Sequence, residues 1–589
     1  MKKHFILLFV FCAIGSIAQG QYVIKDNEEL QNLKNLPEEK VFVHHTGPVV
    51  FVGEYVHYAF YCFNAQTNKA SNISYVGYVA LVNEKGEYVH EEKIRLEKGL
   101  AQGDFFLNTE IPSGHYKLLG YTQWMKNNGL QQVFKDDIVI INPYQVDQQG
   151  LQGEHMESEV SYQDVVKVSD SSIIQIRFDK EQFGTREKVK LALRNYKGPL
   201  GYGNFTIRIQ KKSPFQISQS MNAMEYGTVY LNVANQIDKQ VGDSLFLPEQ
   251  RGELLFGKVT DQASGEPVDN AKMVISVPGE EFLLQFATTD PEGNFYTYLR
   301  KDYKVPQTVI QAKDLRQPLN VKLLQTAKLD VAGLNFGRFT LKPEYAEIIK
   351  KRSVYNQIEN QFFAVKPDSV LLGLPIDPFD GGIPETIDLD EYTRFPTLQE
   401  TLVELLKYAG YRNGPDGDYI RIAQDLQTYN EKTNDFPAIV LIDGVFIPHH
   451  ETIKEFDARK IKTISLIRDQ FALADRDYQG MMVIKTIEGD FYKTYAPEHG
   501  INVPIEKPQP KKNYYRQRYD MVDTASDNIP DYRSLLFWEP HVELEGDALE
   551  FEFYTSDLTG NFDVIVDGFT SYGKPITVYK SISVGDESQ

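Results

Sequence analysis

The feature that most constrains this chain is a series of short apolar runs that alternate with polar residues and end at turn signals. An alternation of period two is typical of strands with one buried face, and several short strands at this spacing predict a β-sandwich. We therefore expect a mainly β, multi-domain protein with an immunoglobulin-like sandwich over residues 36–143. The seven runs in that range are Val41–His45, Tyr55–Phe63, Tyr75–Val82, Tyr88–Leu96, Gly103–Asn108, Gly114–Thr122 and Asp137–Ile141.

Length and composition allow several packed domains. The 589 residues predict about three to five domains, and a hydrophobic content of 42% lets each of them bury a core. The net charge of −20 opposes binding to nucleic acid or to anionic lipid. Cys62 is the only cysteine outside the N-terminal apolar segment, so we expect no internal disulfide and interpret Cys62 as a buried, inert thiol.

Residues 1–20 have the pattern of a secretory signal peptide. Lys2 and Lys3 precede an apolar run, and small residues follow at Ser16 and Ala18. The apolar run is shorter than the ~18 residues that a membrane helix needs. The sequence therefore predicts an exported protein with no transmembrane segment of its own.

The first sandwich resembles the MG2 domain of the α2-macroglobulin superfamily, especially the form found in Bacteroidetes envelope proteins. The resemblance rests on Gly53-Glu54 before an aromatic strand and on the stretch "GDFFLNTEIPSGHYKLLGYTQWM". A second macroglobulin-like sandwich, over residues 165–248, shows only three clear strands. Four further runs in residues 531–585 would complete it. This strand count suggests that everything between the two parts is an insertion.

Residues 249–325 resemble the carboxypeptidase regulatory-like domain, a small seven-stranded sandwich. The match rests on "ELLFGKVTDQASGEPVDNAKMVISV" and "FATTDPEGNFYTYL", in which Gly and Pro shape turns while Val and Phe fill the core. A connector over residues 326–365 follows. Its segment 341–363 has helical spacing, with Pro343 at a position that suits a helix start.

Residues 366–495 resemble the plug domain of TonB-dependent outer-membrane receptors. The segment 436–485 has an apolar strand, a tight turn at Asp443-Gly444, a short polar helix and two more strands, "KIKTISLIRD" and "GMMVIKT". A helix before it begins at Thr397 as N-cap, with Glu400 as its capping box. Fewer than about a hundred residues follow, against ~9–11 residues for each strand of a barrel with at least eight strands. The resemblance implies a plug-like module without its own barrel, and no TonB box is recognisable.

No pattern predicts a catalytic, cofactor or metal site. His44 and His45 are adjacent on a strand and face opposite sides, and His449-His450 lacks the spacing of a helical zinc motif. The sequence has no nucleophile elbow, phosphate loop, dinucleotide fingerprint or thioester motif. We expect neither enzymatic activity nor a cofactor.

These features predict a non-enzymatic binding or scaffold protein, on the periplasmic or surface side of the outer membrane, that works with a β-barrel partner. The candidate contact residues are Asp443, Gly444, His449, His450, Asp469 and Tyr478. The alternative is a thioester-less macroglobulin-like protein that handles proteases non-covalently, with residues 144–168 or 495–530 as its bait. Residues 496–530 also fit a linker, and their basic residues would suit an acidic partner or lipopolysaccharide: Lys507, Lys511, Lys512, Arg516 and Arg518.

Overall fold

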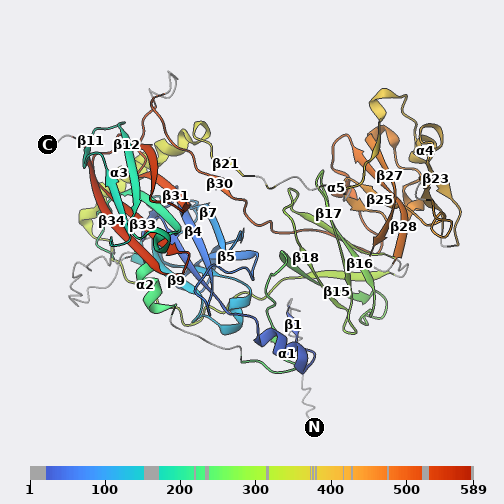
Figure 1. Ribbon diagram of the computed structural model, residues 1–589, viewed down its shortest axis with the longest axis horizontal. Coiled ribbons are helices and arrows are strands. Elements are labelled where there is room, and N and C mark those ends of the chain that lie inside the picture. The colour runs from blue at the N-terminus through green and yellow to red at the C-terminus, as the bar shows by residue number, and fades with distance from the viewer. Residues whose placement is uncertain are drawn as a thin grey trace, which may run out of the picture.

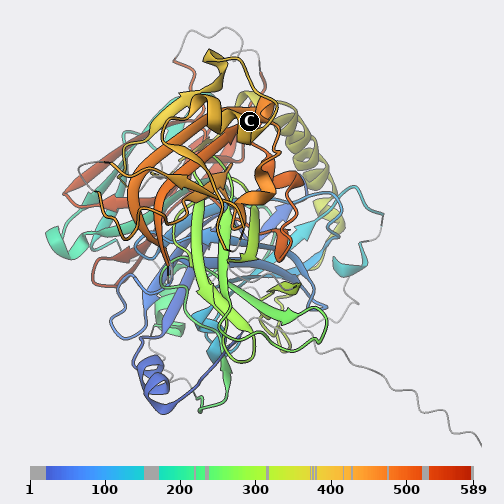
Figure 2. The same cartoon turned by 90° about the vertical axis from the view of Figure 1, so that its right-hand side faces the viewer.

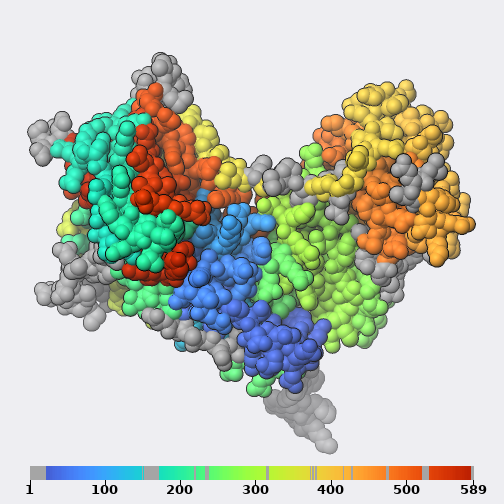
Figure 3. All heavy atoms as spheres, in the orientation of Figure 1, coloured from blue at the N-terminus to red at the C-terminus, as the bar shows by residue number. Residues whose placement is uncertain are grey.

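The molecule has two lobes (Figures 1 and 3). It is mainly β, as the sequence predicts, and no helix within its described part is long and apolar enough to cross a membrane. The signal-peptide segment 1–20 lies outside the described residues. The computed structural model describes residues 21–146, 148–151, 171–217, 220–231, 238–313, 318–371, 373, 377, 381–415, 417–425, 429–473, 476–520 and 529–585.

The first sandwich is drawn blue in Figure 1, and its two sheets enclose an aromatic and branched core. One sheet contains β2 (Glu39–His45), β4 (Tyr55–Asn64) and β7 (Leu100–Phe106), and the other contains β3 (Val49–Phe51), β9 (Phe134–Ile141), β8 (Gly114–Tyr121), β5 (Val76–Asn83) and β6 (Tyr88–Arg95). All seven expected strands are present. The strand β3 was not predicted, because three residues are too few to show an alternation.

The second sandwich combines early and late parts of the chain, drawn teal and red side by side in Figure 1. The four C-terminal strands enter both of its sheets, which is the arrangement suggested by the strand count. The residues between the two parts are therefore an insertion into this sandwich. Its three-stranded sheet is β10 (Ile174–Phe178), β12 (Lys188–Asn195) and β32 (Ala548–Tyr554), and its five-stranded sheet is β11 (Gln182–Phe183), β34 (Pro575–Val584), β33 (Gly560–Thr570), β13 (Gly203–Lys211) and β31 (Leu535–Leu544).

The first two sandwiches share a common core. Phe569 of β33 lies in the aromatic cluster of the first sandwich, with its ring centroid 4.5 Å from that of Phe63 and 5.4 Å from that of Phe42. His44 Nδ1 lies 2.9 Å from an Asp567 carboxylate oxygen on β33. Helix α2 (Ala223–Val229) covers the junction and contributes a buried tyrosine. These contacts join the two sandwiches into one lobe.

The second lobe begins with a third sandwich, which is drawn green in Figure 1. Its last strand follows the next module in the sequence. Residues 500–504, which the sequence suggested to be linker, form β29 and pair with β19, because the edge of that sheet is otherwise open. The linker prediction for 496–530 is corrected here. The sheets are β18 (Asn294–Leu299), β15 (Glu253–Asp261) and β20 (Leu319–Leu324), and β17 (Leu283–Thr288), β16 (Lys272–Val277), β19 (Gln307–Ala312) and β29 (Gly500–Pro504).

An α+β module packs against this sandwich (Figure 2). The hydroxyl oxygen of Thr397 accepts a hydrogen bond from the backbone nitrogen of Glu400, 3.2 Å away, as expected for the N-cap of α4 (Leu398–Leu405). The expected polar helix after the tight turn is wrong: only two short 3-10 turns lie there, at His450–Ile453 and Ala458–Lys460. The main sheet is β22 (Glu385–Asp388), β27 (Ile461–Leu473), β28 (Arg476–Thr486), β25 (Ile439–Ile442) and β26 (Val445–Phe446), beside the pair β23 (Ala409–Arg412) and β24 (Tyr419–Ile422).

Short regular elements lie in the segments between the lobes. Helix α3 (Ala346–Gln361) follows the third sandwich in the sequence, is preceded by a 3-10 turn at Pro343–Tyr345 and lies on the first lobe. The chain finally returns from the second lobe to the first through residues 507–518, which we call the strap. The strap contains β30 (Lys512–Asn513), which pairs with β21 (Ser369–Val370). Two further small elements, β1 (Tyr22–Val23) and α1 (Asn27–Lys34), precede the first sandwich, and β14 (Ser244–Leu245) pairs with β1.

Candidate functional site

The first two predicted contact residues, Asp443 and Gly444, form the tight turn between β25 and β26. The Asp443 carboxylate accepts hydrogen bonds from the backbone nitrogen of Thr486 at 2.8 Å and from that of Phe491 at 3.0 Å. A Cβ atom at Gly444 would lie 2.4 Å from Cβ of Phe282 in the third sandwich. This turn therefore faces the interior of the second lobe.

The other predicted contact residues do not form one exposed surface. His450 is buried, and its Nδ1 accepts a hydrogen bond of 2.9 Å from the backbone nitrogen of Ile420. Tyr478 is buried in the core between the third sandwich and the α+β module, and His449 is half-buried. Asp469, on β27, is the one member of the predicted set whose side chain is exposed in this structure. Most of these residues therefore contribute to packing inside the second lobe and not to one exposed surface.

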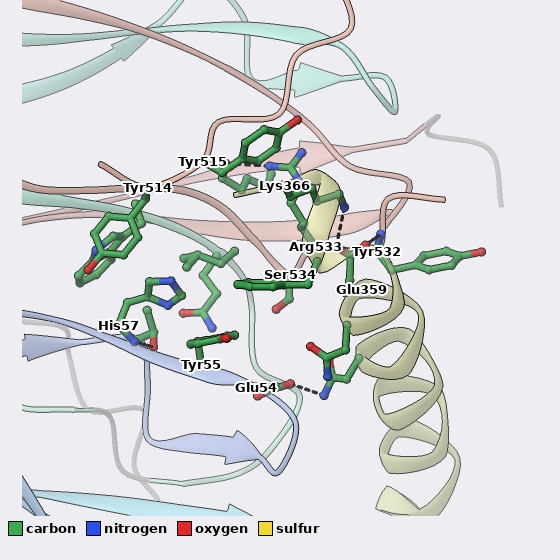
Figure 4. A pocket seen from close by; sticks show the side chains of 18 of the residues that line it. Glu54, Tyr55, His57, Glu359, Lys366, Tyr514, Tyr515, Tyr532, Arg533 and Ser534 are labelled. Carbon is green, nitrogen blue, oxygen red and sulfur yellow. Dashed lines mark hydrogen bonds and ion pairs between the residues drawn. The ribbon is translucent and has the colours of Figure 1, made fainter. Parts of the chain in front are cut away.

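A cleft of about 240 Å³ lies in the first lobe, where four distant segments meet (Figure 4). Strand β4 and the turn before it contribute Glu54, Tyr55 and His57. The end of α3 and the turn after it contribute Glu359, Phe363 and Lys366. The strap contributes Tyr514, Tyr515 and Arg516, and the start of β31 contributes residues 534–538. We call this feature the aromatic cleft.

One wall of the aromatic cleft is a set of stacked rings. The ring of Tyr55 is stacked on that of Phe363, with centroids 5.3 Å apart and planes inclined by 13°. The ring of His57 lies 5.1 Å from that of Tyr514 and 6.0 Å from that of Trp538. Aromatic faces of this kind offer large apolar contact area at fixed geometry.

The opposite wall carries charges that neutralise one another. Lys366 Nζ lies 2.7 Å from a carboxylate oxygen of Glu359, and Arg533 donates two hydrogen bonds of 2.7 Å to Asp531. Figure 4 shows Lys366, Glu359 and Arg533 facing Tyr55 and His57 across the cleft, with Tyr532 pointing away from it. The cleft therefore combines an aromatic wall with a polar wall whose basic side chains are paired with carboxylates.

Glu54 fixes the helix that forms the mouth of the cleft. Its carboxylate accepts hydrogen bonds from Arg352 Nε at 2.7 Å, from Arg352 Nη2 at 2.8 Å and from Asn356 Nδ2 at 2.7 Å. A bidentate contact of this type is among the stronger ion pairs in proteins. The turn before β4 and helix α3 are thereby held in one geometry around the cleft.

Two buried nitrogen atoms at the cleft have no partner with hydrogen-bonding geometry among the described residues. They are Nδ1 of His57 and Nε1 of Trp538. Burial lowers the pKa of His57 and raises the pKa of Tyr514 well above its usual range, so both side chains are neutral near pH 7. An unpaired buried donor or acceptor costs ~1–3 kcal/mol, and such groups are uncommon in native proteins.

The sequence analysis did not identify this cleft. Its one local signal was the run "NYYRQRY", because tyrosines at 514, 515 and 519 are unusual in a polar linker. The expected isolation of His44 from His45 is confirmed: His45 Nε2 lies 2.9 Å from an Asp136 oxygen, and His44 contacts Asp567 instead. Cys62 is buried, and burial raises the pKa of its thiol. Across the described ranges, no group of three acidic, His or Cys side chains is arranged to hold a metal ion.

Comparisons with known proteins return structural similarities only. No family model and no curated protein matches the sequence. α2-Macroglobulin from Escherichia coli, activated by porcine elastase, is 8% identical with a TM-score of 0.23, over 93% of this chain and 44% of that chain. Salmonella α2-macroglobulin reacted with methylamine is 10% identical with a TM-score of 0.23, over 93% and 39%. A tetra-tandem repeat from a large adhesion protein is 8% identical with a TM-score of 0.13, over 93% and 100%.

This chain therefore spans less than half the length of the macroglobulins that it matches. TM-scores of this size do not describe a shared arrangement of domains. The functional proposal for this chain accordingly rests on its own geometry and sequence.

Proposed function

We propose that this chain is a non-enzymatic binding or scaffold protein of a Gram-negative cell envelope, exported and associated with the outer membrane. Its partner in this proposal is an outer-membrane β-barrel protein of a transport or assembly complex. The sequence supports this setting through the signal-peptide pattern and the resemblances to macroglobulin, carboxypeptidase regulatory-like and plug domains. The observation that carries the binding function is the aromatic cleft, with its stacked rings.

The chemistry of the cleft favours binding over catalysis. Its basic side chains are engaged with carboxylates, as in the pairs Lys366–Glu359 and Arg533–Asp531, and the carboxylate of Asp368 accepts a hydrogen bond of 2.8 Å from the backbone nitrogen of Tyr515. The imidazole of His57 contacts aromatic rings, and its lowered pKa follows from burial. A general base is usually oriented by a third group and held beside a nucleophile. The aromatic cleft instead has the rigid apolar faces of a recognition site.

The alternative is a thioester-less macroglobulin-like protein that traps proteases without a covalent bond. Such a protein needs an accessible bait segment. Within the candidate bait 495–530, residues 500–504 are paired in a sheet and Lys512 Nζ lies 2.8 Å from an Asp104 oxygen. The described part of this bait is thus engaged with both lobes, which favours the scaffold proposal. Candidate bait residues 152–168 and 521–528 lie outside the described residues.

The proposal is tested by affinity purification of the tagged full-length protein from detergent-solubilised outer membranes of its native host. We expect a β-barrel protein to co-purify in a fixed ratio with the tagged chain. Recovery of the chain alone in the soluble periplasmic fraction would contradict the proposal. Incubation with trypsin and elastase tests the alternative, which requires one dominant cut together with retention of the protease.

A further inference from the structure

The first sandwich of the first lobe and the third sandwich of the second lobe meet at a polar interface (Figure 3). Lys93 Nζ on β6 lies 2.6 Å from a carboxylate oxygen of Glu253 on β15, and Arg95 Nη1 lies 2.5 Å from an oxygen of Asp302. No cluster of buried apolar side chains among the described residues contains members of both sandwiches. Polar interfaces of this kind between domains permit relative motion. We call this interface the joint, and its members are Tyr75, Tyr78, Lys93, Arg95, Glu249, Glu253, Asp302 and Tyr303.

Two buried carboxylates lie near one ammonium group in the joint. Glu249 is 1% exposed and Glu253 is 2% exposed, and the Lys93 ammonium is engaged with Glu253. The carboxyl of Glu249 instead accepts hydrogen bonds from two neutral donors, the hydroxyl of Tyr78 at 3.0 Å and the backbone nitrogen of Leu254 at 2.9 Å. When ionised, Glu249 therefore has no ion pair of its own within the described part of the chain. A buried carboxylate without such a pair is more stable in water.

The protonation of Glu249 is consequently linked to the closure of the joint. Burial raises the pKa of Glu249 from 4.5 to about 7, although the Leu254 N–H, the charge of Lys93 and the Tyr78 hydroxyl act in the opposite direction. Between pH 4.5 and pH 7 the closed joint therefore binds more protons than an open, hydrated one. Closure is favoured at acid pH, weakens as the pH rises through this range, and changes no further once both states are ionised.

Several other titratable groups act on Glu249 from the elements packed around it. They are Tyr78, Lys93, Lys126, Glu253, Tyr298 and Tyr303. Burial raises the pKa of the three tyrosines, so they stay neutral below pH 8. Burial lowers the pKa of Lys93, but the nearby carboxylate of Glu253 outweighs this effect and raises it overall, so Lys93 stays charged. Burial lowers the pKa of Lys126 to about 8, so this lysine loses its proton one pH unit above Glu249.

We propose that the joint is a pH-sensitive latch between the two lobes, which is closed while the Glu249 carboxyl carries its proton and loosens when that carboxyl ionises and gains water. This inference goes beyond the proposed binding function and does not depend on it. The chain still connects the lobes when the latch is open, so the opening is a limited hinge movement. The strap takes part in this movement, because the backbone nitrogen of Gln509 donates a hydrogen bond of 2.7 Å to the carbonyl oxygen of Lys93.

The first test measures hydrogen exchange of the full-length protein by mass spectrometry from pH 5 to pH 8, corrected for the intrinsic pH dependence of exchange. The reporting peptides cover residues 73–78 and 250–256, because the amide of Tyr75 donates to the Glu249 carbonyl oxygen and that of Leu254 donates to the Glu249 carboxyl. With a pKa of about 7 in the closed joint and 4.5 in the open one, we expect the opening equilibrium to rise about 70-fold over this range. Peptides in β13 (Gly203–Lys211), far from the joint in the second sandwich, should show no such rise.

The variant Glu249→Gln should remove this pH dependence. Its amide keeps an acceptor for the Leu254 nitrogen and offers a donor to the Tyr78 oxygen, as a protonated carboxyl does, so the joint should stay closed at pH 8. Glu266→Gln is the matched control, because this glutamate lies in the same sandwich, is exposed and should retain the 70-fold rise. Circular dichroism checks that each variant is folded.

A second measurement shows whether the opening moves the lobes apart. In the double variant Arg95→Cys/Asp302→Cys, a short bismaleimide joins the two sandwiches at the position of their ion pair, while the native Cys62 is buried. We expect the crosslink to suppress the pH-dependent exchange of both joint peptides, and the same variant without crosslinker to retain it. Three results would overturn the proposal: no pH dependence in the wild-type joint peptides, the same dependence in folded Glu249→Gln, which would assign it to another group such as Lys126, or an undiminished dependence in the crosslinked protein.

Discussion

Acid should weaken the α+β module through one histidine, His450. Burial lowers the pKa of this imidazole to about 3, and its Nδ1 accepts a hydrogen bond of 2.9 Å from the backbone nitrogen of Ile420. A protonated Nδ1 cannot accept that bond. An unfolded histidine has a pKa of about 6.5. Between pH 6.5 and pH 3 the unfolded state therefore binds more protons, and stability falls as the pH falls.

The size of this effect follows from the two pKa values. From pH 7 to pH 5 the linkage between about 6.5 and about 3 removes about 2 kcal/mol from the free energy of unfolding, which corresponds to about 30-fold in the opening equilibrium. The variant His450→Gln removes the titrating group and keeps a side-chain acceptor. We expect this variant to be less stable at neutral pH but to lose about 2 kcal/mol less between pH 7 and pH 5.

Hydrogen exchange measured by mass spectrometry, corrected for the intrinsic pH dependence of exchange, tests this prediction. The peptides that report are those covering β24 (Tyr419–Ile422) and β25 (Ile439–Ile442). His449→Gln serves as the matched control, because it removes the neighbouring ring and leaves the His450 hydrogen bond in place. Equal pH slopes for the wild-type protein and His450→Gln in these peptides would refute the reasoning.

Three further predictions concern the packing between modules. Phe569→Ala should destabilise the first lobe by ~3–5 kcal/mol, because Phe569 is buried in the core that the two sandwiches share. In calorimetry the two sandwiches of this variant should melt together at a lower temperature, whereas Tyr572→Ala should leave the melting temperature unchanged. Burial raises the pKa of Glu249 to about 7, so the folded state binds more protons than the unfolded state between pH 4.5 and pH 7 and loses stability as the pH rises. Glu249→Gln should therefore increase the free energy of unfolding by about 2–3 kcal/mol more at pH 8 than at pH 5, and an equal change in melting temperature at both pH values would contradict this. Gly444→Ala places a Cβ atom 2.4 Å from Phe282 at a φ of +84°. It should lower the free energy of unfolding by ~1–3 kcal/mol more than Gly489→Ala, where φ is +63° and no atom lies within 4 Å of the added Cβ. Similar melting temperatures for the two variants would exclude the clash.

Local patterns in the sequence were sufficient for the strands and for one helix start. Alternation identified the seven main strands of the first sandwich, and the N-cap at Thr397 follows from its spacing to Glu400. Both signals depend on neighbours within a few residues. The expected helix after Asp443-Gly444 is absent from the structure, where the segment forms short 3-10 turns and its apolar side chains Ile447 and Ile453 are buried in the core of the module.

The long-range pairings were harder to infer, for a different physical reason. The pairing of β12 with β32 joins residues more than 350 positions apart, and only the count of incomplete strands suggested it. No such count suggested β29, since the edge of β19 that receives it is not visible in the sequence. The surroundings of the candidate contact residues also depend on long-range packing. A tight turn at Asp443 resembles an exposed loop until the third sandwich is seen to pack on it.

The strap links these long-range features to the aromatic cleft. Ordering a connection between two lobes costs ~1–2 kcal/mol for each residue in backbone entropy, and a polar linker would not recover that cost. Here the chain is fixed in the second lobe by β29, which ends at Pro504. Ten residues later it is fixed in the first lobe by Tyr514, which lines the aromatic cleft. The aromatic residues of the strap offset the entropy through contacts with His57 and the neighbouring rings. A change in the position of the second lobe would therefore act directly on a wall of the cleft, so that a partner held in the cleft and a partner held by the second lobe would influence each other through this short segment.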